Sequence, residues 1–389
     1  MKVMMILFLC LLVSPELNFT QENELFDNLE LGAYDIGLRI IDTKDETRIF
    51  PATNSEQENS RPVKMYVWYP AKAMYSSCRL SLKCYLKFMA ADLRIKAETN
   101  EQIIDALRKN FDLFKNLELK NLDSLYQKES KAILDALPLD GAFPVVVVGE
   151  GNRYGSAINN FILCEYLASN GFVVVSYPSV GTNSLKPENS LEDIETQVQD
   201  LNFILSEVTT FPNANDEKIA LVGFDMCGFA SFLLQMRNTK IDALACLSNQ
   251  STYDHSIQLL KKVPGFGAET LFVPMLHFMN DELNYSSTGS KEEFSIIQTS
   301  DKVDRYLVRL NKFPNSAYTS FCMLGIIEEG YNPSEIKSNY KNICEYTLGF
   351  LNSYLKDDEK AKEYLMSEIN KTESLSGNIR IEYLPGKEM

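Results

Sequence analysis

The sequence has 389 residues, of which 45% are hydrophobic and 23% are charged, and its formal net charge is −15. This composition is ordinary for a folded globular protein and excludes a collagen-like or disordered chain. Nucleic-acid-binding proteins neutralise phosphates with Lys and Arg, so a chain this acidic is expected to have no nucleic-acid partner.

Residues 1–20 have the pattern of a secretory signal peptide. Lys2 precedes an apolar run over residues 3–13, which Ser14 and Pro15 end. A membrane-spanning helix needs about 20 apolar residues, so this run is too short to cross a bilayer. We expect cleavage after Thr20 and a secreted, periplasmic or cell-envelope protein with no membrane span beyond the signal segment. An uncleaved anchor is the alternative. Residues 21–32 are polar and acidic and form an expected flexible lead.

Seven cysteines follow the signal segment, so at least one thiol is free. Cys78 and Cys84 flank a short loop and could form a disulfide in an exported protein, whereas most of the others lie in apolar runs. No cysteine pair has zinc-ligand spacing with a histidine nearby, so we expect no metal site and no cofactor.

The first half of the chain contains two strand patterns and a helical segment. The strand patterns, at residues 33–41 and 62–70, are expected to pair antiparallel, with the first at the sheet edge. Residues 82–137 have helical periodicity and form an expected helical insertion or cap.

The second half alternates between strands and helices. Phe143–Gly149 is apolar at every position except its glycine, which is typical of a parallel strand buried on both faces. Further strands are expected at 171–177, 218–223, 242–247, 271–278 and 305–312, and helices at 159–169, 191–208, 226–236, 334–354 and 358–369. Short alternation of this kind predicts one α/β domain over residues 33–389, with a doubly wound, mostly parallel sheet.

The segment GFDMCG at residues 223–228 lies between an expected strand and an expected helix. This is the context of the G-x-S-x-G turn, in which a nucleophile occupies a strained position above the sheet. Asp225 stands at the serine position and Cys227 at the second glycine position, while Gly223 and Gly228 are small enough for a close strand–helix approach. The alternative is a generic turn between a strand and a helix.

Five segments resemble exported α/β-hydrolases of the dienelactone hydrolase and platelet-activating-factor acetylhydrolase-like group, in the right order. They are RPVKMYVWYPA, FPVVVVGEG, LCEYLASNGFVVVSYPSVGT, IALVGFDMCGFAS and CEYTLGFLNSYLK, and the resemblance covers residues 34–365, including the helical insertion. It implies an α/β-hydrolase fold and carboxylic ester hydrolase chemistry. The family has a nucleophile at the elbow, then an acid after a later strand, then a histidine after the last strand.

The resemblance assigns each of these roles to a position in this sequence. Asp225 holds the nucleophile position and Asp281 the acid position. Asn315 or Tyr318, depending on the alignment, holds the histidine position within FPNSAYTSF. Asn does not titrate near neutral pH and an unperturbed Tyr titrates near pH 10, so neither relays a proton as imidazole does.

The resemblance also implies an oxyanion hole and a pocket next to the elbow. The backbone N–H groups of Met226 and Gly151 are the expected donors, with Glu150 and Cys227 in the pocket. Many relatives carry His-Gly or Pro-Gly where this chain has Glu150-Gly151.

The chain has two histidines, and neither follows the last expected strand. His277 lies in an apolar strand pattern and is predicted to be a core residue. His255 follows the strand expected at 242–247, on the loop-bearing end of the sheet, and is the candidate for a substitute base.

Three functions follow from these patterns. The first is a secreted pseudo-hydrolase that binds a small apolar or ester-like ligand, which the changes at the nucleophile, the second elbow glycine and the histidine favour. This ligand is expected to be uncharged or cationic, because Asp225 and Glu150 lie near the expected mouth of the pocket. The second is an active hydrolase that uses an Asp225 nucleophile with His255 as base, or an Asp225–Glu150 pair that shares a proton. The third is a protein-interaction module with a vestigial pocket.

Overall fold

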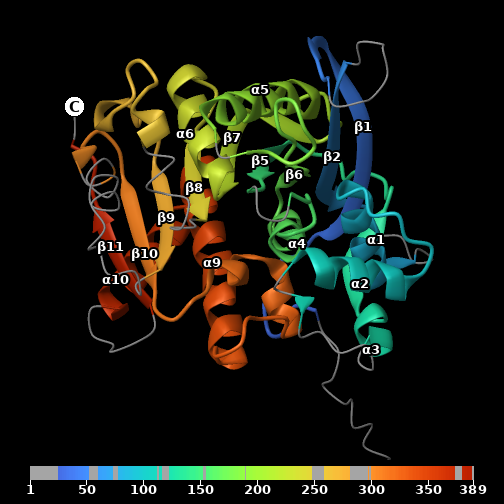
Figure 1. Cartoon of the computed structure of the whole chain (residues 1–389). Coiled ribbons are helices and arrows are strands. Elements are labelled where there is room, and N and C mark those ends of the chain that lie inside the picture. The colour runs from blue at the N-terminus through green and yellow to red at the C-terminus, as the bar shows by residue number, and fades with distance from the viewer. Residues whose placement is uncertain are drawn as a thin grey trace, which may run out of the picture.

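The computed structural model describes residues 25–51, 60–72, 78–111, 114–115, 122–151, 155–188, 190–247, 258–280, 297, 299–372 and 379–387. Within these ranges the strands form one 11-stranded sheet in the order β11-β10-β9-β8-β7-β5-β6-β2-β1-β4-β3 (Figure 1). Their bounds are β1 Asp35–Ile49, β2 Ser60–Ala71, β3 Arg79–Ser81, β4 Glu129–Leu134, β5 Phe143–Gly149, β6 Val173–Tyr177, β7 Ala214–Phe224, β8 Ala243–Leu247, β9 Met275–Asn280, β10 Arg305–Leu310 and β11 Ile379–Leu384.

The centre of the sheet is parallel and its flanks are largely antiparallel. Strands β6, β5, β7, β8, β9 and β10 are joined by parallel pairing. β1 pairs antiparallel with β2, as the sequence predicts. The parallel strands are apolar along most of their length because both of their faces are covered. Their carboxyl ends meet at one edge of the sheet, where an α/β protein builds its site.

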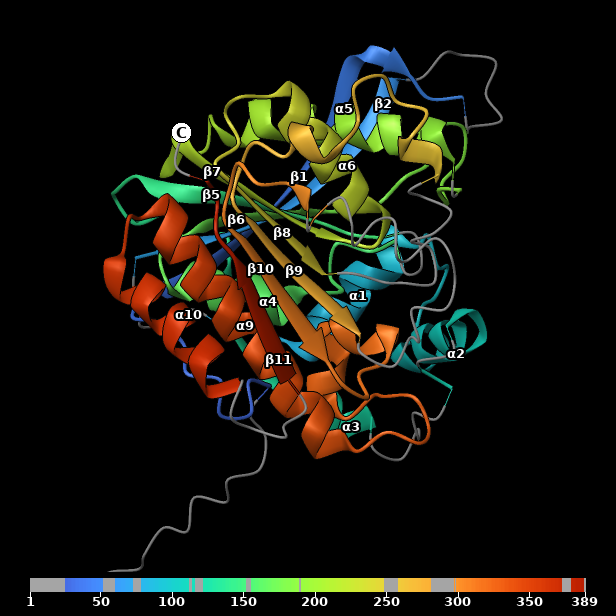
Figure 2. The ribbon, with the colours of Figure 1, turned by 90° about the vertical axis from the view of Figure 1, so that its left-hand side faces the viewer.

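Helices cover both faces of the sheet. α5 (Leu191–Val208) and α6 (Met226–Arg237) pack on one face, and α4 (Phe161–Ser169), α9 (Pro333–Leu355) and α10 (Glu359–Thr372) lie on the other (Figure 2). α5 begins where the sequence predicts, because Ser190 accepts a hydrogen bond from the Asp193 N–H and caps the helix. The remaining elements are α1 (Leu82–Asp92), α2 (Asn100–Asn110), α3 (Leu122–Tyr126) and the 3₁₀ turns η3 (Ala268–Thr270), η4 (Asn315–Tyr318) and η5 (Ser320–Leu324).

The structure differs from the sequence-based expectation at both ends of the sheet. The segment 82–137 contains helices α1, α2 and α3 but also strand β4, which pairs parallel with β1, so β1 is an interior strand rather than an edge. At the other end, β11 pairs antiparallel with β10. β4 and β11 have only six residues each, and strands this short are defined by pairing with their neighbours, β1 and β3 for β4 and β10 for β11, more than by their own composition.

All seven cysteines in the described ranges are free thiols. Cys84 lies on α1, where its Sγ is 3.7 Å from Ser81 Oγ, and Cys78 precedes β3. The disulfide between Cys78 and Cys84 that the sequence permits is therefore absent. None of the helices in these ranges is long and apolar enough to cross a lipid bilayer.

Candidate active site

The turn between β7 and α6 has the backbone geometry of a nucleophile elbow. Asp225 has φ 53° and ψ −123°, in the left-handed half of the Ramachandran plot, although it is not a glycine. Its N–H donates to the Leu247 carbonyl (3.2 Å), and its own carbonyl accepts from the Gly228 N–H (3.0 Å). A non-glycine residue in such a conformation costs about 1–3 kcal/mol, so the surrounding structure must hold it there.

Close packing of strand and helix holds this turn. A Cβ added at Gly223 would lie 2.6 Å from the backbone of Gly228, so the two segments meet without a side chain between them. Cys227 stands at the second glycine position of the motif, and its side chain fits because Gly149 on the neighbouring strand β5 has no side chain. A Cβ added at Gly149 would lie 1.8 Å from Cys227 Sγ. Gly149 therefore compensates for the cysteine in the turn.

The Cys227 thiol is a buried structural group. It lies 3.3 Å from the Tyr177 hydroxyl and 4.0 Å from Ser231 Oγ. Burial raises the pKa of Cys227 to about 12, so the thiol is neutral near pH 7 and is not a nucleophile.

The structure brings Gly151 directly against Asp225. A Cβ at residue 151 would lie 2.4 Å from Asp225 Cβ and 2.9 Å from Oδ2, which means that the loop after β5 contacts the elbow side chain. Met226 is the first residue of α6, next to Asp225 in the chain. Asp225, Met226 and Gly151 thus meet at the carboxyl ends of β5 and β7, and Asp225 is only 5% exposed.

Glu150 points away from this group and into the protein. Its carboxylate accepts hydrogen bonds from the side-chain amides of Asn159 and Asn160, both at 3.2 Å, just before α4. The residue is fully buried, and burial raises the pKa of Glu150 to about 8, so this carboxyl is mostly protonated near pH 7. The sequence-based expectation of a charged Glu150 at the pocket mouth is wrong, because the residue is buried against α4.

Asn315 and Tyr318, the two candidates for the histidine position, both bind Asn280, which precedes Asp281 in the chain. Asn280, the last residue of β9, donates from Nδ2 to Asn315 Oδ1 (3.2 Å) and accepts at Oδ1 from the Tyr318 hydroxyl (3.0 Å). Asn315 and Tyr318 both lie on η4, which follows β10.

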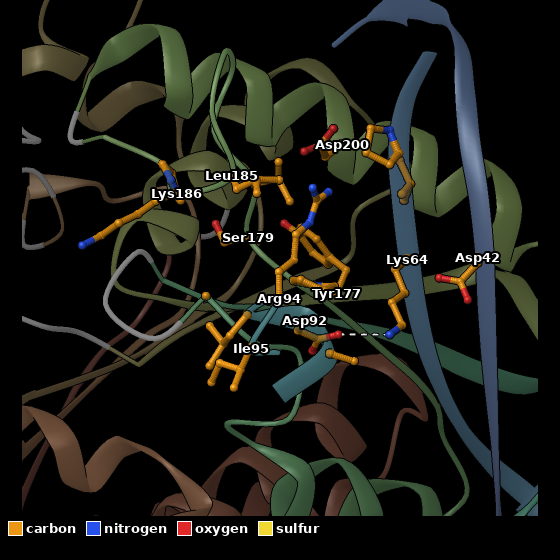
Figure 3. A pocket seen from close by; sticks show the side chains of 18 of the residues that line it. Asp42, Lys64, Asp92, Arg94, Ile95, Tyr177, Ser179, Leu185, Lys186 and Asp200 are labelled. Atoms are coloured by element: carbon orange, nitrogen blue, oxygen red, sulfur yellow. Dashed lines mark ion pairs between the residues drawn. The ribbon is translucent and has the colours of Figure 1, made fainter. Parts of the chain in front are cut away.

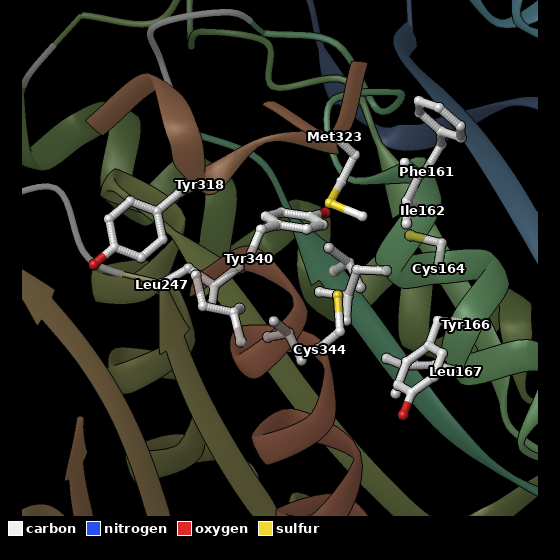
Figure 4. Packing of buried hydrophobic residues seen from close by; sticks show 14 of the residues in the cluster. Phe161, Ile162, Cys164, Tyr166, Leu167, Leu247, Tyr318, Met323, Tyr340 and Cys344 are labelled. Atoms are coloured by element: carbon white, nitrogen blue, oxygen red, sulfur yellow. The ribbon is translucent and has the colours of Figure 1, made fainter. Parts of the chain in front are cut away.

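Tyr318 joins this cluster to the elbow. Its ring lies 6.2 Å from that of Phe224, the residue before Asp225, and it belongs to the same buried cluster as Leu247 and Tyr340 (Figure 4). Burial raises the pKa of Tyr318 well above its usual range, so the phenol keeps its proton. Because Asn280 bonds to both residues, the two alternatives for the histidine position form one hydrogen-bonded cluster.

Of the two histidines, the structure describes only His277. His277 is a core residue, as predicted: it lies inside β9 and is 1% exposed, and burial, together with the positive charge of Arg309, lowers its pKa to about 3. His255 and Asp281 lie outside the described residues. In the part of the chain that the structure describes, no group of three or more His, Cys, Asp or Glu side chains is arranged to hold a metal ion.

Asn280 and Gly149 are absent from the residues that the sequence predicts for this site. Asn280 was detectable as the polar residue that ends the apolar strand MLHFMN, one position before Asp281. Gly149 was detectable only as an unusual glycine in FPVVVVGEG, since its role depends on a contact across the sheet.

Comparisons with known proteins agree with this architecture. No protein-family model matches the chain, and no curated protein sequence matches it either. Among solved structures, the chain is similar to a ferulic acid esterase from Streptomyces cinnamoneus, with a TM-score of 0.59, 16% sequence identity, and coverage of 84% of this chain and 91% of that chain. At this identity the likeness concerns the fold and leaves activity open. The strand order, the elbow and this likeness together show that the chain has the α/β-hydrolase fold.

Proposed function

We propose that this chain is an exported α/β-hydrolase-fold protein that has lost ester hydrolysis and binds a small apolar ligand. The observation that carries the proposal is the Asn280–Asn315–Tyr318 cluster, which engages both candidates for the histidine position in hydrogen bonds at the ends of β9 and β10. An amide has no titratable proton near neutral pH, and a buried phenol is a poor base, so this cluster cannot activate a nucleophile.

The elbow itself also favours loss of the family chemistry. In a serine-type hydrolase, a base deprotonates the hydroxyl that attacks the ester, whereas a carboxylate that attacks an ester forms a mixed anhydride. An ionised carboxylate at residue 225 would also oppose the oxyanion that Met226 and Gly151 would have to stabilise. The elbow keeps its backbone geometry while the side chains at the nucleophile and histidine positions have changed. This combination supports a degenerate relative of the dienelactone hydrolase and acetylhydrolase-like group.

An Asp225–Glu150 pair is disfavoured as a catalytic alternative. The Glu150 oxygens are directed to Asn159 and Asn160 and are fully buried, so they are not available to activate a water molecule. The alternative with Asp225 as nucleophile and His255 as base is an outcome of the test below.

Turnover of aryl esters, alkyl halides and epoxides tests the proposal. We expect the purified protein to release p-nitrophenol from short-chain p-nitrophenyl esters no faster than its Asp225→Asn and His255→Ala variants do. A fluorophosphonate probe is expected to leave residue 225 unlabelled, because it needs an activated serine. Turnover that disappears in Asp225→Asn would show an active hydrolase, and further loss in His255→Ala would identify its base.

Export is part of the proposal and has its own readout. Expression of the full chain in a secreting host should give an extracellular or periplasmic protein whose first residue is Gln21, as determined by intact mass. A cytoplasmic chain that retains residues 1–20 would contradict export.

A further inference from the structure

A pocket of about 580 Å³ opens at the carboxyl edge of the sheet, on the β6–β2–β1 side. β5 separates this side from the elbow strand β7, so the pocket lies beside the elbow rather than above it. Its wall comes from the middle of β1, the start of β2, the end of α1 and the connection between β6 and α5 (Figure 3). A pocket of this size suits a small organic ligand.

Most of the wall is apolar. The pocket is lined by side chains of the insertion on one side and of the β6–α5 connection on the other, including Leu93, Ile95, Phe111, Tyr177, Leu185 and Pro187. The expected ligand therefore has an apolar body.

Of the three acids that line the pocket, Asp42, Asp92 and Asp200, the last two are already bound by cations. Lys64 Nζ lies 3.2 Å from the Asp92 carboxylate, whose side chain is fully buried. Asp200 accepts two hydrogen bonds from the Arg61 guanidinium, at 2.6 Å and 2.5 Å. Asp92 and Asp200 are therefore not left to bind a cationic ligand, and Asp42 lies at the β1 wall of the pocket.

Arg94 and Ser179 are donors that the pocket offers to a ligand. The Arg94 side chain extends from the end of α1 into the pocket, whereas Lys186 points away from it, and Arg94 forms no ion pair with any described residue (Figure 3). Ser179 is only 3% exposed, yet its Oγ has no hydrogen-bond partner within the described ranges. A buried hydroxyl without a partner is costly, so a ligand atom that completes its hydrogen bonding is favoured.

The backbone at Arg94 does not require an arginine. The Ile95 N–H donates to the Ala90 carbonyl (2.8 Å) and the Arg94 N–H to the Ala91 carbonyl (3.1 Å), which is the Schellman pattern that ends many helices. Arg94 has φ 51° at the position of this motif where glycine is preferred. An arginine is therefore not needed to end α1, and replacing it by glycine tests the side chain without breaking the turn.

We propose that this pocket binds the carboxylate of a small apolar acid, with Arg94 and Ser179 as donors to the carboxylate. A guanidinium matches the planar fork of a carboxylate with two parallel hydrogen bonds. A single available guanidinium near Asp92 and Asp200 suits a monoanion better than a dianionic phosphate. The charge of the ligand is thus opposite to the expectation from Asp225 and Glu150 in the sequence. The inference rests on the proposal that the chain binds its ligand rather than hydrolysing it.

Calorimetric titration with decanoate tests the inference, with decan-1-ol and decyl phosphate as comparison ligands. We expect decanoate to bind and the alcohol to bind at least about tenfold more weakly, because hydrogen bonds to charged groups are the stronger ones. Arg94→Gly should weaken decanoate binding by about ten- to a hundredfold, and Ser179→Ala by a smaller factor.

Arg94→Gly also separates binding from folding. Glycine is preferred at this backbone position, so the variant should unfold at the same temperature or about 2 °C higher while it loses affinity. Lys312→Gly is the matched control, since Lys312 has φ 49°, carries the same charge and does not line the pocket; it should bind decanoate normally.

Three results would overturn the inference: no binding of decanoate by the wild-type protein, unchanged affinity in Arg94→Gly, or equal or tighter binding of the alcohol or the phosphate. Failure of the proposed function is seen separately, as turnover of esters, because an active esterase could still bind a carboxylate product in this pocket.

Discussion

Two residues that are not glycine, Asp225 and Arg94, end regular elements with nearly the same φ, at 53° and 51°, but for different reasons. Asp225 is buried between β7 and α6, where Gly223 and Gly228 touch and the Leu247 carbonyl receives its N–H. Arg94 is exposed, and its turn needs only the helix-ending hydrogen bonds of α1. The fold imposes the left-handed conformation on any residue at position 225, whereas glycine would suit the conformation at position 94 better than arginine does. The strain at Asp225 is therefore a property of the fold, and the fold does not require an arginine at position 94.

The largest expected effect comes from breaking the elbow. Gly149→Ala places a Cβ 1.8 Å from Cys227 Sγ, so we expect a loss of about 4 kcal/mol in the free energy of unfolding, measured by urea denaturation. Adding Cys227→Gly should recover most of the loss, because it removes the clashing sulfur and restores the second glycine of the motif. If the double variant Gly149→Ala/Cys227→Gly loses as much free energy of unfolding as the two single variants together, Gly149 and Cys227 do not compensate for each other.

A smaller effect concerns the buried acid next to the elbow loop. The pKa of Glu150 is raised from 4.5 to about 8, so the folded chain holds a proton that the unfolded chain releases above about pH 4.5. The contribution of this proton to the free energy of unfolding is fully present below about pH 4.5 and is lost as the pH rises towards 8. We expect the free energy of unfolding to fall by about 3 kcal/mol between about pH 5 and pH 8.

Glu150→Gln mimics the protonated acid and should remove this loss, so the variant should be more stable than the wild type at pH 8 and similar at pH 5. Urea denaturation at the two pH values measures the difference, with the exposed Glu217→Gln as a control that should keep the wild-type dependence. Equal pH dependence in wild type and Glu150→Gln would show that Glu150 is not buried as a neutral acid.

The smallest effect tests whether the left-handed backbone of Arg94, unlike that of Asp225, would suit glycine better. Arg94→Gly and Lys312→Gly should each increase the free energy of unfolding by up to about 1 kcal/mol, because both remove a side chain from a left-handed backbone at an exposed position. Arg94→Ala should give no such gain, since alanine keeps a Cβ. A clear loss of stability in Arg94→Gly would show that its side chain supports the fold, which would remove the contrast with Asp225.

The sequence by itself determined the order of elements and the place of the elbow. Continuous apolar runs such as Phe143–Gly149 and the capped helix Leu191–Val208 depend on local pattern, and both lie where the pattern predicts. The strand–turn–helix context of Asp225 was likewise readable, because the small residues that the turn needs are neighbours in the chain.

Only the tertiary structure decided what surrounds that turn. The contact between Gly149 and Cys227, the hydrogen bonds from Asn280 to Asn315 and Tyr318, and the burial of Glu150 against α4 join residues far apart in sequence. The same holds for the pocket of Arg94 and Ser179, whose walls come from several segments that are far apart in the sequence. Charge patterns along the chain cannot show which groups are neutralised, because desolvation and pairing depend on distances that exist only once the sheet has formed.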